Sequence, residues 1–486
     1  MNTPSTPCPQ IGFSRRDALE RLGCGFGSLA LAAIAGNTPA AAAAGARSIA
    51  GPMVARPGVV PARAKRIIFL FMAGGVSHVD SFDYKPRLQT DEGKMHGFAD
   101  LRSIAKTGTS PQQRVMAPLW NFKQHGQSGL WVSDLFPEMA AHVDDLCVIR
   151  SMHTEGIAHG PATLFMHTGS TNFIRPSMGA WVGYGLGTEN QNLPGFVTIC
   201  PSLSNGGPRN YGTAFLPAAY QGTAVGRSGQ RMQEVAIRHL ASEKKVGGDA
   251  LQLDAIRALN AAQAAGAAAG SDIEALVESY ELAWRMQSAA PQVFDLDTEP
   301  ESVRTLYGIG NPVTEQYGRQ CLLARRLAEA GVRFIQVNYG DNSNNPSWDQ
   351  HSNLKKHGDH AAAVDRPVAG LLADLKQRGL LEDTIIWWGG EFGRTPYAEK
   401  NGTGRDHNPA GFSIWLAGGG FKSGVAYGET DEFGHHAVSE KVHMHDLHAT
   451  LLNSLGLDHQ RLTFRYAGRD FRLTDVHGEV VGDLYA

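Results

Sequence analysis

The feature that most constrains the fold is a continuous apolar segment near the start of the chain, from Lys65 to Met72. Its centre reads Arg-Ile-Ile-Phe-Leu-Phe, without the alternation of polar and apolar residues that a strand with one solvated face shows. Strands of this kind are typically buried on both faces of a parallel sheet. Because Ala73-Gly74-Gly75 ends the run, we predict a central first strand here.

Short apolar segments alternate with amphipathic segments along the rest of the chain. Helices are predicted over Gln316 to Ala330 and Ala361 to Arg378, because both show helical periodicity and a glycine follows each. Further strands are expected at residues 145–149, 195–199, 332–337, 384–388 and 413–417. This alternation predicts an α/β fold, with a doubly wound, mostly parallel central sheet and helices on both faces.

The composition fits a large globular protein and argues against nucleic-acid binding. With 486 residues, 42% of them hydrophobic, the chain can bury an extensive core. A net charge of -3 provides no global field that would draw in nucleic acid. An Ala-rich, strand-poor stretch predicts a helical insertion at about residues 240–300. We therefore expect one domain over residues 46–486 that contains this insertion.

The amino terminus has the features of a targeting segment. Ser14-Arg15-Arg16-Asp17 precedes an apolar, small-residue run from Phe26 to Ala35 and then an alanine run from Ala40 to Ala44. This order resembles a twin-arginine export signal with a cleavage site, so residues 1–45 are excluded from the fold. The weaker alternative is an amino-terminal membrane anchor, for which the run is short and rich in glycine and alanine. The expected location is periplasmic or secreted, with no transmembrane segment in the mature chain.

Histidine and carboxylate residues gather in five short segments, each beside a predicted strand or helix end. Because the carboxyl ends of parallel strands share one edge of a sheet, such segments can meet. Cys147, Cys200 and Cys321 are too scattered for a thiolate site, so oxygen and imidazole would hold a metal ion. The divalent ion could be Zn, Mn, Ca or Mg. The candidate ligands are His78, Asp80, Asp349, His351, Glu391, Asp406, His407 and His443.

Each candidate also has a simpler interpretation. Asp80 could cap a turn, and Asp349 and His351 could be solvated residues of a polar loop. The adjacent Asp406 and His407 form the strongest pair, because a carboxylate and an imidazole on a glycine-flanked loop can reach one ion. Asp446 is expected to cap a helix and not to bind metal.

Two motifs resemble the alkaline phosphatase and sulfatase superfamily. Residues Thr384 to Gly393 resemble a strand and turn that deliver an acidic ligand, here Glu391, although Phe392 replaces the second ligand that follows it there. Residues His159 to Gly169 keep the Pro and Thr-Gly frame of the sulfatase signature, with His159 at the nucleophile position. Because this position is neither Cys nor Ser, formylglycine chemistry does not carry over.

The mature chain as a whole resembles a large bacterial family of twin-arginine-exported proteins of unknown function, related to the sulfatases. The resemblance is carried by three segments and extends from about residue 60 to residue 486. They are Met72 to Asp80, Gly390 to Pro396, and His445 to Gly456. It implies an alkaline phosphatase-like fold.

The resulting hypothesis is an exported, metal-dependent hydrolase of phosphate or sulfate esters, whose substrate is a small molecule or a glycan. His159 could attack the ester, act as a general base, or bind metal. Arg394 could hold the anionic substrate, or form a salt bridge that fixes its loop. The alternative is a non-catalytic scaffold or binding component of an exported or cell-surface assembly; a phosphomutase is a third, less favoured possibility.

Overall fold

The computed structural model describes residues 53–98, 112–235, 281–282, 285–286, 290–399 and 402–486. The predicted export signal and most of the predicted helical insertion lie outside the described residues. Among the described helices, none combines the length and apolar character needed to cross a membrane.

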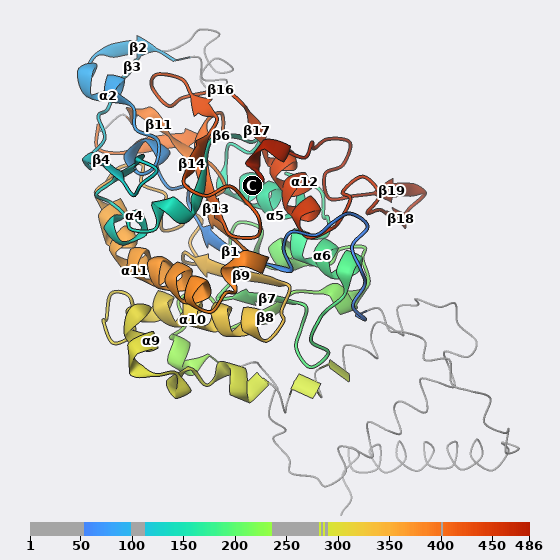
Figure 1. Cartoon of the computed structure of the whole chain (residues 1–486). Helices are drawn as coiled ribbons and strands as arrows, with labels where there is room; N and C mark the ends of the chain where they lie inside the picture. Colours follow the sequence, from blue (N-terminus) through green and yellow to red (C-terminus); the bar gives the residue numbers. More distant parts are fainter. Residues whose placement is uncertain (1–52, 99–111, 236–280, 283–284, 287–289, 400–401) are drawn as a thin grey trace, which may run out of the picture. The chain divides into compact units, whose positions relative to one another are not determined.

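A mixed central sheet organises the fold (Figure 1). Within the described residues it has nine strands, in the order β14-β6-β13-β10-β1-β9-β7-β8, with β17 paired to β6. The strands are β1 (Arg66–Met72), β6 (Leu146–His153), β7 (Phe196–Ile199), β8 (Thr223–Val225), β9 (Phe334–Tyr339), β10 (Thr384–Gly389), β13 (Phe412–Ala417), β14 (Val425–Tyr427) and β17 (Val442–His443). The predicted first strand does lie in the interior of this sheet, between β10 and β9.

Most neighbouring strands are parallel, as predicted, but one is reversed. Strands β10, β1, β9, β7 and β8 run in the same direction. Strand β13 is antiparallel to both β10 and β6, so β6 again runs with β10. The sequence predicted β13 as a strand but not its direction, because a run of buried apolar residues has the same appearance either way.

Helices cover both faces of the sheet. Alternate residues of β1 point to opposite sides: Ile68 and Leu70 join the hydrophobic cluster under α10 and α11, while Ile67 and Phe69 join the cluster under α5, α6 and α12. Burial of each such side chain contributes about 1.5–3 kcal/mol. The helices are α2 (Pro86–Thr90), α4 (Pro137–Ala140), α5 (His159–Thr168), α6 (Met178–Leu186), α9 (Glu301–Leu306), α10 (Glu315–Glu329), α11 (Lys356–Gln377) and α12 (Met444–Ser454).

Several two-stranded sheets lie outside the central one. The pair that matters most for the site is β11 (Gly393–Ala398) with β12 (Arg405–Asn408), in which Arg394 lies opposite His407. The other pairs are β2 (Met95–Gly97) with β3 (Gln112–Arg114), β4 (Phe122–His125) with β5 (Leu130–Ser133), β15 (Glu429–Thr430) with β16 (Ala437–Ser439), and β18 (Phe464–Tyr466) with β19 (Arg469–Phe471).

The strand directions bring five chain segments to one edge of the sheet. The carboxyl ends of β1, β6, β9 and β10 share this edge, and so does the amino end of the reversed strand β13, which β12 precedes. The loops that leave these strand ends carry most of the candidate ligands. The edge of the sheet therefore positions the site described next.

Candidate metal centre

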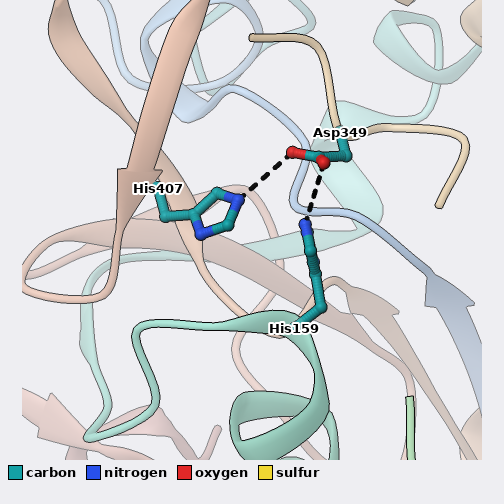
Figure 2. Close-up of side chains that lie close together, drawn as sticks. All are labelled: His159, Asp349 and His407. Atoms are coloured by element: carbon teal, nitrogen blue, oxygen red, sulfur yellow. Dashed lines mark hydrogen bonds and ion pairs between the residues drawn. The ribbon is translucent and has the colours of Figure 1, made fainter. Parts of the chain in front are cut away.

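Two of the predicted ligands, His351 and His407, and the predicted catalytic residue His159 come together around the carboxylate of a third predicted ligand, Asp349. His159 is the first residue of α5, Asp349 and His351 lie in the loop after β9, and His407 lies in β12. Figure 2 shows His159 and His407 pointing at Asp349 from two sides. Asp349 is only 2% exposed, so its negative charge needs close partners.

The imidazole Nε2 atoms lie close to the Asp349 oxygens. His159 Nε2 is 3.2 Å from Oδ2, while His351 Nε2 and His407 Nε2 are 2.9 and 3.2 Å from Oδ1. The Nε2 atoms of His351 and His407 are themselves 3.0 Å apart. Three nitrogen atoms therefore face the two oxygens of a single carboxylate.

The opposite nitrogen of each ring has its own acceptor. His159 Nδ1 donates to Glu391 Oε1 at 2.6 Å, and His351 Nδ1 lies 3.1 Å from Glu399 Oε1. His407 Nδ1 lies 2.7 Å from the carbonyl oxygen of Ile157, which can only accept. A neutral ring that donates from Nδ1 directs the lone pair of Nε2 toward Asp349.

This donor set fits a divalent cation. A lone pair that faces a carboxylate oxygen is repelled unless a proton or a cation lies between them. Histidine ligands to metals commonly donate their other N–H to a carboxylate or a main-chain carbonyl, as all three rings do here. Two overlapping donor sets each have their ligand atoms within 4.8 Å of one another: His159, Asp349 and His407, and His351, Asp406 and His407.

The protonation equilibria reflect the same arrangement. Burial opposes ionisation of Asp349, but hydrogen bonds from the three imidazoles and the charge of Arg394 outweigh it and lower the pKa of Asp349. Burial would lower the pKa of His159, but Asp349 and Glu391 raise it to about 9. The hydrogen bond to Asp349 also raises the pKa of His351. Protons therefore compete with a metal ion for the Nε2 atoms of His159 and His351, whereas burial lowers the pKa of His407.

Glu391 lies behind His159. Both of its carboxylate oxygens are 3.0 Å from the main-chain nitrogen of Gly74, and Oε1 also accepts from His159. Gly74 has φ +114°, and a Cβ there would come within 2.7 Å of the main-chain nitrogen of Asp349, so only glycine fits. We expected Glu391 as a direct ligand, whereas the structure places it where it orients His159.

Arg394 is buried and fully engaged, which corrects its expected role in substrate binding. Its Nη2 donates to Asp349 Oδ1 at 2.8 Å, and its other contacts are to the main-chain oxygens of Gly74, Gly75, Trp348 and Arg405. With no exposed surface, the guanidinium cannot reach an anionic ester. The structure favours the second of the two roles considered, a salt bridge that fixes the loop.

Phe392, which replaces an expected ligand, forms an apolar wall of the site. Its ring stacks on His407, with the ring centroids 4.4 Å apart, and lies 5.1 Å from the ring of His159. The side chain is almost completely buried. It thereby restricts the orientation of both imidazoles.

Three predicted ligands lie apart from this cluster. Asp80 accepts from Arg405 Nε at 2.7 Å, from Ser77 Oγ and from the main-chain nitrogen of Leu119, so both its oxygens serve structural bonds. His78 is buried, and its Nε2 lies 2.7 Å from the carbonyl oxygen of Gly434. His443 is the amino-terminal cap of α12 and forms a capping box with Asp446. Asp446 was expected to cap this helix, so its position is close to the predicted one.

The sequence interpretation missed two residues of the site. Glu399 follows β11 and lies against His351, and Arg405 forms the buried ion pair with Asp80. Neither residue belongs to a motif with a recognisable spacing. The only hint in the sequence was that Arg405 directly precedes Asp406 and His407, and this did not indicate which carboxylate Arg405 would pair with.

Comparison with known proteins supports membership of a family of unknown function, as the resemblance implied. Residues 64–485 match the model of the family described as "Protein of unknown function (DUF1501)". The chain belongs to this family. No curated protein matches it.

Several solved structures are weakly similar to this DUF1501 protein. The lipoteichoic acid synthase LtaP from Listeria monocytogenes is 10% identical, with 85% of this chain and 75% of that chain covered and a TM-score of 0.34. A protein of the alkaline phosphatase superfamily from Vibrio parahaemolyticus is 9% identical, with coverages of 84% and 70% and a TM-score of 0.34. The alkaline phosphatase from the Antarctic bacterium TAB5 is 10% identical, with coverages of 76% and 96% and a TM-score of 0.29. Similarity at this level gives no ground for transferring an activity.

Proposed function

We propose that this DUF1501 protein is an exported, metal-dependent hydrolase of phosphate or sulfate esters. One observation carries the proposal: three histidines turn their Nε2 atoms toward the buried carboxylate of Asp349 while their Nδ1 atoms are bound on the other side. This arrangement fits a divalent ion, and it lies at the sheet edge where α/β proteins bind ligands.

The proposed ligands are His159, Asp349, His351 and His407, with Asp406 in reach on the His351 side. Of the four ions expected, Zn²⁺ suits a set rich in imidazole better than Mn²⁺, Ca²⁺ or Mg²⁺, which favour oxygen donors. When bound, the ion would supply positive charge for the oxygens of the ester and for its leaving group.

The protein residues have supporting roles in this scheme. Arg394 fixes Asp349, and Glu391 fixes His159, so the donors keep their positions while charge develops on the substrate. Both ring nitrogens of His159 face carboxylates, so we assign it to metal binding and not to attack on the ester. His351 is 30% exposed and marks the side from which substrate would enter.

The test combines metal analysis with hydrolysis. Wild-type protein purified from its native host should contain a stoichiometric transition metal and should release phosphate or sulfate from some ester. His407→Ala should lose both properties, while His477→Ala, a change at an exposed histidine, should keep both. Equal metal content and equal turnover in both variants would refute the proposed centre.

Export is a separate part of the proposal, supported by Arg15-Arg16 and the apolar run that follows. Replacing Arg15 and Arg16 together by lysine should retain the protein in the cytoplasm of a host that has the twin-arginine pathway. Arg21→Lys is the matched control and should leave export unchanged. Unchanged export of the double variant would contradict this part.

A non-catalytic scaffold is the second candidate, favoured by the complete burial of Arg394. Arg394 was the residue expected to bind the anionic ester, and its contacts leave it no such role. A stoichiometric metal without turnover on a broad panel of phosphate and sulfate esters would favour the scaffold. Metal-dependent turnover would exclude it.

A further inference from the structure

A small pocket with polar and apolar lining residues lies near the chain segments that carry the Asp349 centre. Its volume of about 20 Å³ gives room for about one water-sized group. Three of its lining residues adjoin the centre: Ala73 precedes Gly74, Thr163 lies one helical turn after His159, and the carbonyl of Pro346 accepts from the main-chain nitrogen of Asp349. The pocket is therefore lined by the chain segments that also carry residues of the centre.

Part of the pocket wall comes from polar residues in a buried strand. Gln336 and Asn338 lie two residues apart in β9, so they share one face of an otherwise apolar strand. Asn338 Nδ2 donates to the main-chain oxygen of Ile199 at 2.7 Å. A carbonyl oxygen can only accept, so this bond fixes the orientation of the Asn338 amide.

The orientation of Gln336 follows from that of Asn338. Asn338 Oδ1 must accept, and Gln336 Nε2 donates to it at 2.6 Å. Gln336 Oε1 is then an acceptor by necessity, and it is buried without a partner in a side chain that is only 2% exposed.

Asn210 brings a second acceptor to the same pocket. Its Nδ2 donates to the main-chain oxygen of Asn205 at 3.1 Å, which again fixes the amide. Its Oδ1 is buried and has no partner, and the residue is 8% exposed. Gln336 and Asn210, each with an unpartnered amide oxygen, thus line one pocket.

Buried acceptors of this kind require a hydrogen-bond donor. The anionic groups of phosphate and sulfate esters offer mainly acceptor oxygens, and the negatively charged residue Asp341 also lines the pocket. The unpartnered acceptors and the charge of Asp341 therefore disfavour the anionic part of a substrate, while a hydroxyl or ammonium group matches the pocket in size, charge and hydrogen bonding.

We propose that this pocket is a subsite for a hydroxyl or ammonium group on the alcohol part of the ester, an inference that rests on the proposed function. The substrate class would be esters of polyols, sugars or amino alcohols. The Asp349 centre would hold the ester group, and Gln336 and Asn210 would accept hydrogen bonds from the adjoining donor.

The test compares matched esters on the metal-loaded, full-length mature protein. The phosphate and sulfate esters of ethanol, glycerol and ethanolamine are titrated by calorimetry, with KM measured wherever turnover occurs. The glycerol or the ethanolamine ester should bind about tenfold more tightly than the ethanol ester, the gain expected from one or two hydrogen bonds. Which of the two is preferred separates a hydroxyl ligand from an ammonium ligand.

Variants test whether the preference among the three esters comes from the pocket. Gln336→Leu and, independently, Asn210→Leu should remove it, with thermal unfolding used to verify that each variant folds. Gln320→Leu is the matched control, because Gln320 is another buried glutamine with an unpartnered oxygen but does not line the pocket, and it should keep the preference.

Equal affinity for all three esters would mean that the pocket holds only ordered water, and would overturn the inference. So would a preference that survives in both leucine variants, or no binding of any ester. Tighter binding of the glycerol or ethanolamine ester without turnover would refute the proposed hydrolase activity but support the subsite. The failure of one proposal can therefore be distinguished from the failure of the other.

Discussion

Two histidine-rich regions of this protein differ in what surrounds their rings. In the Asp349 centre three imidazoles face one buried carboxylate. In the second region, at the start of α12, the rings of His153, His443, His445 and His477 follow one another at centroid distances of 5.0 to 5.4 Å. There the nearby carboxylate of Asp446 accepts main-chain N–H groups instead.

The protonation behaviour separates the two regions. Asp349 and Glu391 raise the pKa of His159 to about 9 against the effect of burial. In the second region burial lowers the pKa of His443 to about 4. Burial also lowers the pKa of His448, whose ring lies next in the row at 6.1 Å from that of His445, to about 3. Of the two regions, only the Asp349 centre combines a buried anion with an acceptor behind each ring, which is the setting typical of histidine ligands to metals.

The largest expected effect is at the central carboxylate. Asp349→Asn keeps the shape of the side chain but removes the charge that the three imidazoles face. We expect complete loss of stoichiometric metal, measured by elemental analysis after dialysis. Asp446→Asn, in the second region, is the matched control and should keep the metal. If Asp349→Asn also keeps it, the contrast between the two regions fails.

Acid should act on the second region through stability. His448 is fully buried and its folded pKa of about 3 lies below its unfolded value of 6.5, so the unfolded state binds more protons below pH 6.5. The free energy of unfolding should fall by about 1.4 kcal/mol per pH unit for this histidine as pH drops from 6.5 toward 3. Chemical denaturation at several pH values measures the slope.

His448→Gln should reduce the slope of the free energy of unfolding against pH by the contribution of about one proton, because glutamine does not titrate. The change His477→Gln, at an exposed ring, should not alter it. An unchanged slope in His448→Gln would show that its ring is protonated in the folded state as readily as in the unfolded one.

A smaller effect is expected from the residue behind His351. Glu399→Leu removes the acceptor of His351 Nδ1, and loss of such an outer partner typically weakens metal binding by about 10- to 100-fold. Competition with a chelator gives the affinity. Glu399→Gln, which keeps an acceptor oxygen, should recover most of the loss, and an equal loss in both variants would contradict this role.

The smallest expected effect is at His443, the one late histidine predicted from the sequence as a ligand. Because it caps α12 and lies apart from Asp349, His443→Asn should leave the metal content unchanged within error. Asparagine is itself a good capping residue, so stability should change by less than about 1 kcal/mol. A loss of metal in this variant would return His443 to the list of ligands.

The sequence was a good guide to the framework and to part of the centre. The run from Arg66 to Met72 is the parallel strand it predicted, and α10 matches its predicted helix to within one residue at each end. His159, Asp349, His351, Glu391 and His407 meet at one sheet edge because that edge collects strand ends, which the pattern of strands indicated.

Other roles depended on contacts that a linear pattern does not contain. Asp80 follows a strand as a ligand should, but Arg405, 325 residues away, uses its carboxylate. His78 is buried against a main-chain oxygen at a separation of 356 residues. Nothing in the residues next to Asp80 or His78 records these distant partners.

Arg394 joins three stretches of chain that are distant in sequence: the turn after β1, the loop that carries Asp349, and the strand that carries His407. These tethers are hydrogen bonds within the protein, so they hold whether or not a cation is present. Binding of the cation should then need little rearrangement of the polypeptide. The rate of binding should be set by the loss of protons from the imidazoles.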